Sequence, residues 1–202
     1  MKVRVKICGI TRVEDAHAAI AVGADMIGLN FYAKSPRYVD VERAREIRAA
    51  VESRAVVVGV FVNAERAYVD DRLRAVSLEM IQFSGDEDDA APAGWPVPSI
   101  VTRRLKQGDL SSVMPHHADY VLFDAFNEKL YGGSGSRIPL EQLRRLDLSR
   151  AFVAGGLNPE NVAEVAALEP YAVDCASGVE SSPGVKDHDK LRSFVNNAKR
   201  SR

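Results

Sequence analysis

The stretch Lys6-Ile7-Cys8-Gly9-Ile10-Thr11 decides the fold, because it forms the turn after the first predicted strand. A doubly wound open sheet of the dinucleotide-binding type would carry the pattern G-x-G-x-x-G at this place. Here the turn reads Cys8-Gly9-Ile10-Thr11, so that pattern is missing. A closed parallel barrel is therefore favoured over the open sheet.

Apolar runs alternate with helical patterns along the chain, which is typical of parallel βα units. The predicted strands are residues 3–7, 26–31, 55–62, 78–83, 99–103, 120–124, 151–154 and 171–176. Helices are expected at residues 13–21, 41–51, 64–75, 140–146, 159–168 and 188–198. The fourth and fifth helices should be short or degenerate, since residues 86–98 are acidic and then rich in Ala, Pro and Gly. We predict an α/β fold, a single-domain (β/α)8 TIM barrel over residues 1–202.

Composition excludes several classes of partner. The chain has 27 Lys and Arg against 28 Asp and Glu, which gives no support to nucleic acid or a membrane surface as a partner. No apolar run approaches a membrane span and the first residues lack a signal-peptide core, so a cytoplasmic location is expected. Cys8, Cys175 and the four histidines form no metal-like spacing, so no structural zinc is expected. A monomer and a homodimer fit the sequence equally.

Cys8 is a candidate catalytic base at the end of the first strand, where TIM barrels build their active sites. Strand alternation predicts that it points inward together with Arg4 and Lys6. A nearby cation such as Lys6 would lower the pKa of the thiol toward neutrality. The alternative is that Cys8 is a small buried hydrophobic residue. Both inward cations need carboxylate partners such as Asp174.

Asp124 and Arg37 are further candidates at this rim. Asp124 ends the sixth strand, where partial burial would raise its pKa and allow general acid catalysis. It could equally cap the next loop or pair with a lysine of the barrel. Arg37 follows the second strand and suits bidentate capture of a carboxylate, although a lone loop arginine is more often simply solvated.

Glycine-rich loops follow the last two strands and indicate a phosphorylated small-molecule ligand. They are Gly155-Gly156-Leu157-Asn158 and the segment that starts at Ser177-Gly178. TIM barrels recurrently hold a phosphate between these two loops, on exposed backbone N–H groups. Ordinary left-handed turns are the alternative. A third glycine-rich segment, residues 131–136, could be a closing lid or a plain exposed loop.

Five segments resemble the phosphoribosylanthranilate isomerases and occur in the order of that family. They are Lys6-Ile7-Cys8-Gly9-Ile10-Thr11, Lys34-Ser35-Pro36-Arg37-Tyr38-Val39, Gly59-Val60-Phe61-Val62-Asn63, Gly155-Gly156-Leu157-Asn158 and the run from Ser177-Gly178-Val179-Glu180 to Asp187. The resemblance implies a TIM-barrel isomerase of tryptophan biosynthesis that uses no metal or organic cofactor. Its reaction would be the Amadori rearrangement of N-(5'-phosphoribosyl)anthranilate to 1-(2-carboxyphenylamino)-1-deoxyribulose 5-phosphate.

The resemblance also implies a role for each candidate residue. Asp124 would protonate the ribose ring oxygen, and the Cys8 thiolate would then remove the C2' proton. Because the two groups act in opposite protonation states, the rate should have a bell-shaped pH profile. Arg37 would hold the anthranilate carboxylate. Residues of the two last loops, Gly155, Gly156, Ser177 and Gly178, would line the substrate and phosphate site. Glu180 belongs to the shared motif without an assigned role.

Three departures from the family pattern concern substrate binding. Ser84-Gly85 stands where members usually have His-Gly, residues 136–140 replace a Phe-Asp-Trp-like segment, and Cys175 takes a place that is usually aliphatic. A catalytically weak or silent phosphate-binding barrel, or another phosphosugar isomerase, therefore stays open as an alternative. The candidate acid, base and phosphate loops are nevertheless all present.

Overall fold

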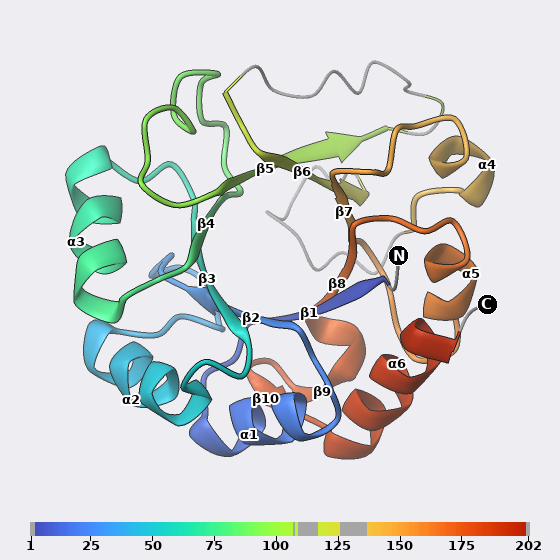
Figure 1. Cartoon of the computed structure of the whole chain (residues 1–202), viewed down its shortest axis with the longest axis horizontal. Coiled ribbons are helices and arrows are strands. Elements are labelled where there is room, and N and C mark those ends of the chain that lie inside the picture. The colour runs from blue at the N-terminus through green and yellow to red at the C-terminus, as the bar shows by residue number, and fades with distance from the viewer. Residues whose placement is uncertain (1–2, 107, 109–116, 126–136, 201–202) are drawn as a thin grey trace.

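Eight parallel strands, hydrogen-bonded in chain order, form a closed barrel in the computed structural model of this chain. The structure describes residues 3–106, 108, 117–125 and 137–200. Figure 1 shows the strands as a ring with helices outside it, and β1 lies beside β8 where the ring closes. The strands are β1 (Arg4–Cys8), β2 (Met26–Asn30), β3 (Val56–Phe61), β4 (Met80–Phe83), β5 (Ser99–Leu105), β6 (Tyr120–Ala125), β7 (Ala151–Val153) and β8 (Ala172–Cys175). The predicted barrel is therefore confirmed.

Six α-helices cover the outside of the barrel within the described residues. They are α1 (Val13–Ala21), α2 (Val41–Val51), α3 (Arg66–Val76), α4 (Leu140–Leu143), α5 (Val162–Ala166) and α6 (His188–Arg200). Helix α2 begins where the carboxylate of Asp40 accepts a hydrogen bond from the Arg43 N–H, which is a normal N-cap. Helix α6 buries an apolar stripe at helical spacing, made of Leu191, Phe194, Val195 and Ala198.

The irregular part of the helical layer lies where the sequence predicts it. Residues 84–98, between β4 and β5, form turns rather than an α-helix. Helix α4 is shorter than the predicted 140–146, because beyond Leu143 the chain continues with i→i+3 hydrogen bonds of the tighter 3-10 type. Most of the connection after β5 lies outside the described residues, as does the glycine-rich segment 131–136 that the sequence marks as a candidate lid.

Other features of the backbone also differ from the prediction. Helix α5 forms only the middle of the predicted helix 159–168, because turns precede and follow Val162–Ala166. Strand β5 continues beyond the predicted 99–103, because Arg104 and Leu105 go on pairing with Asp124 and Ala125 of β6. The chain after β8, expected as a loop, forms a 3-10 turn, η1 (Ser177–Val179), and a small antiparallel hairpin. The hairpin strands are β9 (Glu180–Ser182) and β10 (Val185–Lys186), and Gly184 between them has a φ of 83°.

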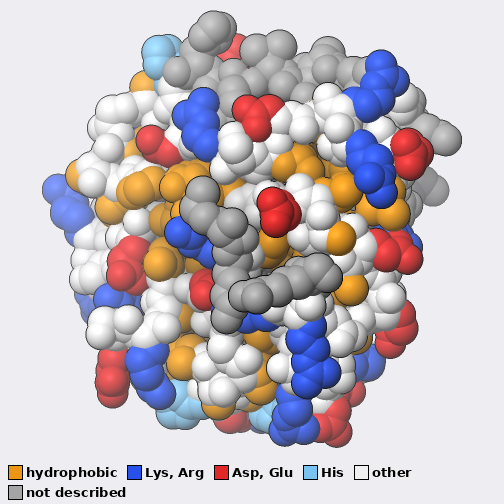
Figure 2. Space-filling model, turned by 45° about the vertical axis from the view of Figure 1, so that its right-hand side comes forward, with side chains coloured by type: hydrophobic (Ala, Val, Ile, Leu, Met, Phe, Trp, Pro, Cys, Tyr) orange, Lys and Arg blue, Asp and Glu red, His pale blue; other side chains and the backbone are white. Residues whose placement is uncertain are grey.

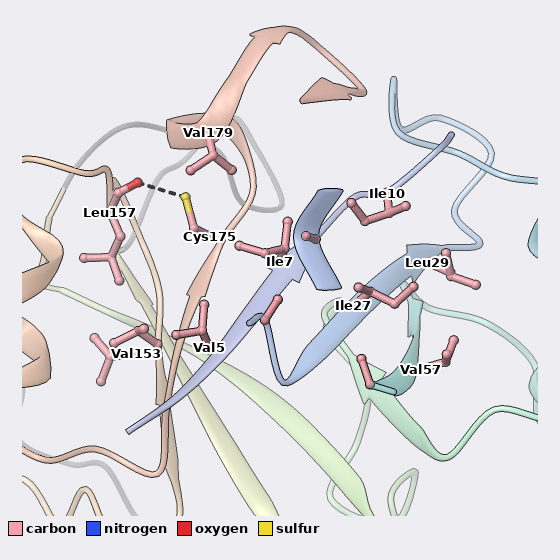
Figure 3. Packing of buried hydrophobic residues seen from close by; sticks show 14 of the residues in the cluster. Val5, Ile7, Ile10, Ile27, Leu29, Val57, Val153, Leu157, Cys175 and Val179 are labelled. Atoms are coloured by element: carbon pink, nitrogen blue, oxygen red, sulfur yellow. Dashed lines mark hydrogen bonds between the residues drawn. The ribbon is translucent and has the colours of Figure 1, made fainter. Parts of the chain in front are cut away.

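The core has two layers, as strand alternation requires. One layer fills the space between strands and helices, and Figure 3 shows part of it, with Val5 and Ile7 of β1 near Val153 and Ile27. The other layer fills the barrel and is built from inward positions of seven strands, with Ala154 directly after β7: Met26, Val58, Met80, Ile100, Leu122, Phe152, Ala154 and Ala172. On the outer surface, basic and acidic side chains are interspersed over the face shown in Figure 2.

Strand β1 contributes charged side chains to the barrel interior, as predicted. The Lys6 ammonium, fully buried, donates a hydrogen bond of 2.8 Å to Oδ2 of Asp174 on β8, which confirms the expected pairing. Burial is the largest influence on the pKa of Lys6 and lowers it, but the charges of Asp174 and Cys8 and the hydrogen bonds to them together outweigh burial and raise the pKa. Arg4 is satisfied differently, because its guanidinium lies 4.4 Å from the ring centroid of Tyr171.

Removing the buried cation should destabilise the barrel strongly. We expect Lys6→Met to lower the free energy of unfolding by about 3–5 kcal/mol, because Asp174 would keep a buried, unpaired charge. Chemical denaturation measures this change. In the double variant Lys6→Met/Asp174→Leu most of the lost stability should return, since both charges are then absent. A double variant no more stable than Lys6→Met would show that the loss comes from packing rather than from charge.

Candidate active site

A cavity of about 570 Å³ opens at the carboxyl ends of the strands. Its wall includes six of the seven predicted site residues: Cys8, Arg37, Asp124, Gly155, Gly156 and Ser177. The seventh, Gly178, follows Ser177 directly but is not part of the wall. The structure therefore brings residues from the ends of β1 and β6 and from the segments after β2, β7 and β8 to one place, as expected for the functional face of a TIM barrel.

Asp124 lies in the cavity wall with a carboxyl group that is almost buried, the whole residue being 8% exposed. Burial raises its pKa to about 6, and the nearby charge of Asp174 acts in the same direction. A hydrogen bond from the Ala125 N–H and the charge of Arg104 oppose the shift without cancelling it. Asp124 can therefore hold a proton near neutral pH far more readily than an ordinary aspartate, as its place in the sequence predicts.

Gly155 makes room for this carboxyl group. A Cβ at Gly155 would lie 2.7 Å from Oδ1 of Asp124 and 2.8 Å from the Ala125 nitrogen, and its φ of 83° also favours glycine. The residue was expected only to line the substrate site. Its close approach to Asp124 shows that it also sets the space in which the acidic side chain lies.

Cys8 is partly exposed at the end of β1, where the sequence places it. Its sulfur fits against Gly28 of β2, where a Cβ would come within 2.8 Å of Sγ. The expectation of a lowered thiol pKa is wrong for this structure, because desolvation raises the pKa of Cys8 above its ordinary value. Lys6 and Lys186 favour the thiolate, as the nearby-cation argument requires, but they do not outweigh the loss of water around the sulfur.

The loops after β7 and β8 are in direct contact. A Cβ at Gly178 would lie 1.9 Å from the carbonyl oxygen of Leu157, so glycine is needed for this approach. In the same region the Cys175 thiol donates to the Leu157 carbonyl at 3.1 Å, a contact drawn in Figure 3. The side chain of Asn161 donates to the Gly156 carbonyl at 2.9 Å. These contacts give the two glycine-rich loops one fixed shape.

Arg37 reaches the cavity from the loop after β2 and is held by Glu180. Nε donates to Oε1 at 2.8 Å and Nη2 to Oε2 at 2.7 Å, which is a two-point ion pair. The hydrogen bonding of Arg37 to Glu180 is the main reason that the pKa of Arg37 is raised further. The sequence suggested that Arg37 binds a carboxylate. It did not show that the carboxylate of Glu180 already occupies one edge of the Arg37 guanidinium.

The wall formed by β4 and β5 contains polar residues that sequence analysis did not assign. Ser84 stands where the family has histidine, and its hydroxyl accepts a hydrogen bond of 2.9 Å from Gln82 and lies 3.0 Å from the Thr102 hydroxyl. The Arg104 guanidinium donates to the Ser84 carbonyl. All four side chains line the cavity. Strand parity would have found Gln82, Thr102 and Arg104, since they share the inward face with Ile100 and Met80.

Asp174 also lines the cavity, a position beyond its expected role as the partner of Lys6. Its Oδ2 accepts from Lys6, whereas Oδ1 is buried without a hydrogen-bond partner among the described residues. A buried acceptor of this kind is costly unless a ligand or water satisfies it. Among the same residues, no group of three or more His, Cys, Asp or Glu side chains could hold a metal ion. None of the described helices is long and apolar enough to cross a membrane.

The fold and this cavity define a TIM-barrel enzyme that carries a carboxyl group and a thiol at the functional ends of its strands. Residues 5–197 match the family described as N-(5'phosphoribosyl)anthranilate (PRA) isomerase. The chain belongs to this family, which confirms the resemblance found in the sequence.

Individual relatives agree with this assignment. The chain is 47% identical over 198 residues to the N-(5'-phosphoribosyl)anthranilate isomerase of Pseudomonas fluorescens strain Pf0-1, covering 96% of this chain and 97% of the relative. Its fold is similar to the phosphoribosyl anthranilate isomerase of Thermus thermophilus, with a TM-score of 0.88, 37% identity and coverage of 96% and 97%. A further similar structure, with a TM-score of 0.81, 36% identity and 98% coverage of both chains, is a phosphoribosyl anthranilate isomerase in complex with reduced 1-(o-carboxyphenylamino)-1-deoxyribulose 5-phosphate.

Proposed function

We propose that Asp124 and Cys8 are the acid and base with which this chain converts N-(5'-phosphoribosyl)anthranilate to 1-(2-carboxyphenylamino)-1-deoxyribulose 5-phosphate. This Amadori rearrangement is the isomerase step of tryptophan biosynthesis. The observation that carries the assignment of roles is a carboxyl group with a pKa of about 6 in the same cavity as a thiol. Family membership supplies the substrate, and the cavity supplies the two groups that move protons.

The protons balance within the substrate and the two side chains. Asp124 donates a proton to the ribose ring oxygen, so the C1'–O bond breaks and C1' forms a Schiff base with the anthranilate nitrogen. The Cys8 thiolate removes the C2' proton, and the electron pair moves toward C1' to give an enolamine. Tautomerisation to the ketone then transfers the C2' hydroxyl proton to Asp124 and a proton from the Cys8 thiol to C1'. Each side chain can recover its starting state, because the reaction is an isomerisation.

The remaining predicted residues would hold the substrate. Arg37 offers the second edge of its guanidinium to the anthranilate carboxylate, since Glu180 takes only two of its five N–H donors. Backbone N–H groups of Gly156, Ser177 and Gly178 would bind the phosphate, supported by the fixed contact between their two loops. Oδ1 of Asp174 would accept a hydrogen bond from a sugar hydroxyl.

The wider setting of the enzyme is part of the same proposal. The chain would act as one barrel domain, as a monomer or homodimer. A cytoplasmic location fits two cysteines that carry no disulfide. The β4–β5 wall has Ser84 where the family usually has histidine. A catalytically silent barrel therefore stays the alternative that a turnover assay has to test.

Turnover of freshly generated phosphoribosylanthranilate tests this function directly. The purified chain should remove the anthranilate-type fluorescence of the substrate and form the ketose product, identified by mass and by its ultraviolet spectrum. Binding of the reduced ketose analogue without any turnover would instead support a silent barrel. If the chain shows no binding of the analogue and no turnover, the assigned substrate is contradicted.

The pH profile of kcat/KM should be bell-shaped. Its acidic limb should belong to the general acid and its alkaline limb to the general base, the reverse of the usual assignment. Asp124 must be protonated and Cys8 ionised, yet the pKa of Asp124 is about 6 and that of Cys8 is raised above its ordinary value. Between the two pKa values, each pH unit lowers one reactive form about tenfold and raises the other about tenfold, so the rate stays level. Below pH 6 only the thiolate fraction changes, and it falls.

The low-pH limb near 6 therefore reports Asp124, and the alkaline limb reports Cys8. The substrate phosphate also titrates at about pH 6. Carbon NMR of the aspartate γ-carboxyls, with Asp124→Asn to assign the signal, separates the two. An Asp124 carboxyl that titrates at the value of an ordinary aspartate would contradict the assigned acid.

A further inference from the structure

Glu180 lies at the centre of a buried ionic cluster that the proposed chemistry leaves without a role. Its carboxylate accepts from Arg37 at 2.8 and 2.7 Å and from the Lys186 ammonium at 2.8 Å. The residue is 8% exposed, and the Lys186 side chain is fully buried. Burial alone would raise the pKa of Glu180, but the two cations outweigh this and lower it, so the group is ionised.

Lys186 anchors this carboxylate to the catalytic end of the barrel. Besides Glu180, its ammonium donates to the carbonyl of Cys8 at 2.7 Å and to that of Ala176 at 3.1 Å. All three N–H donors of the ammonium are therefore used. The bond to Cys8 reaches the backbone of the candidate base. The bond to Ala176 reaches the residue before Ser177 of the candidate phosphate loop.

The aliphatic part of the Arg37 side chain packs against Gly9. A Cβ at Gly9 would lie 2.4 Å from Cδ of Arg37, so this glycine forms the surface on which the arginine lies. The backbone N–H of Arg37 donates to the Ser35 hydroxyl at 3.1 Å. The arginine is thus fixed at its backbone, its stem and the Nε edge of its guanidinium.

Fixing that edge has a chemical consequence for the opposite edge. A guanidinium presents two pairs of parallel N–H donors, and Glu180 takes the pair that includes Nε. The Nη1–Nη2 pair keeps the direction that the first ion pair imposes. Two cations and one carboxylate leave the cluster with one positive charge, which an incoming carboxylate would neutralise.

We propose that Glu180, seated on Lys186, is a positioning residue that orients Arg37 for the carboxylate of the substrate next to Cys8. The inference rests on the proposed role of Arg37. Glu180 does not touch the reacting atoms. Its effect should therefore appear as selectivity for ligands that carry a carboxylate, rather than as a general loss of binding.

Two ligands that differ only in the carboxyl group test this directly. One is reduced 1-(o-carboxyphenylamino)-1-deoxyribulose 5-phosphate, and the other is the same compound with an unsubstituted phenyl ring. Their dissociation constants are measured by calorimetry for each variant. The wild-type chain should prefer the carboxylated ligand by roughly 10- to 100-fold, the range for hydrogen bonds to charged groups.

Glu180→Gln should lose most of this preference while binding the phenyl ligand as the wild type does. Arg37→Met should abolish the preference, and adding Glu180→Gln to Arg37→Met should change nothing further, because Glu180 acts through Arg37. Lys190→Met is the matched control, since the exposed Lys190 ammonium contacts the backbone carbonyl of Glu180 and not its carboxylate. It should keep the full preference.

The outcomes separate the two proposals. If Arg37→Met keeps the preference, the role of Arg37 is wrong. If Arg37→Met removes the preference but Glu180→Gln keeps it, only the inference about Glu180 is overturned. Equal weakening of both ligands by Glu180→Gln would indicate a merely structural role. Should Glu180→Gln fail to fold, Glu180→Asp keeps the charge next to Lys186 but is one methylene too short for the same contacts, and the same loss of preference is expected.

Discussion

Replacing Asp124 by asparagine is expected to lower kcat by about 10²- to 10⁴-fold, the usual contribution of a positioned general acid. Asparagine has nearly the same shape and can still accept the hydrogen bond from the Ala125 N–H, so the cavity should keep its form. The amide cannot transfer a proton to the ring oxygen, and the ring then opens slowly. Steady-state turnover of phosphoribosylanthranilate by the purified variant measures the effect.

Asp119→Asn is a matched control at the other end of β6. Its carboxylate accepts from the Ser99 N–H at 2.8 Å, next to the amino-terminal end of the strand, where residues of TIM barrels serve stability rather than catalysis. Turnover should therefore be kept in Asp119→Asn and lost in Asp124→Asn. Equal turnover in wild type and Asp124→Asn would assign the acid to another group, for which Asp174, the other carboxyl residue that lines the cavity, is a candidate.

Replacing Cys8 by alanine is expected to produce a loss of the same order, about 10²- to 10⁴-fold in kcat, because the proton acceptor for C2' is removed. Serine has nearly the shape of cysteine but is far less acidic, so Cys8→Ser should not restore the rate. Binding of the reduced ketose analogue should survive in both variants, since the thiol binds neither the phosphate nor the anthranilate carboxylate in the proposed mechanism.

Cys175→Ser is the control for the general loss of a thiol. Burial raises the pKa of Cys175 to about 12, so this sulfur is a poor base, and its contact with the Leu157 carbonyl can be kept by a serine hydroxyl. Most turnover should survive. Near-normal rates in Cys8→Ala would return Cys8 to its alternative interpretation as a small buried residue.

The properties that sequence predicted well are local. Alternation along β1 correctly placed Lys6 and Cys8 inside the barrel, because side chains on a strand change face at every residue. Proline, glycine and acidic residues in 86–98 correctly predicted the missing helix, because they disfavour it wherever the segment lies. Strand ends were less certain, since pairing with a neighbour extended β5 to Leu105.

The properties that sequence missed depend on distant neighbours. The thiol pKa was expected to fall beside a cation, but its direction depends on how much water the surrounding strands exclude. The partner of Arg37 lies more than a hundred residues away on β9, a strand without an apolar pattern of its own. The motif contained Glu180 and Lys186, but only the folded hairpin shows that they meet.

The seam between β1 and β8 has a consequence for how the chain is made. Lys6 and Asp174 are 168 residues apart, so β1 leaves the ribosome well before β8 and waits for it before the barrel can close. Contacts of such long sequence separation form late and slowly. During this wait β1 offers an unpaired edge, a common starting point for aggregation. Two basic side chains on the strand, Arg4 and Lys6, keep that edge charged and hydrated until its partner arrives.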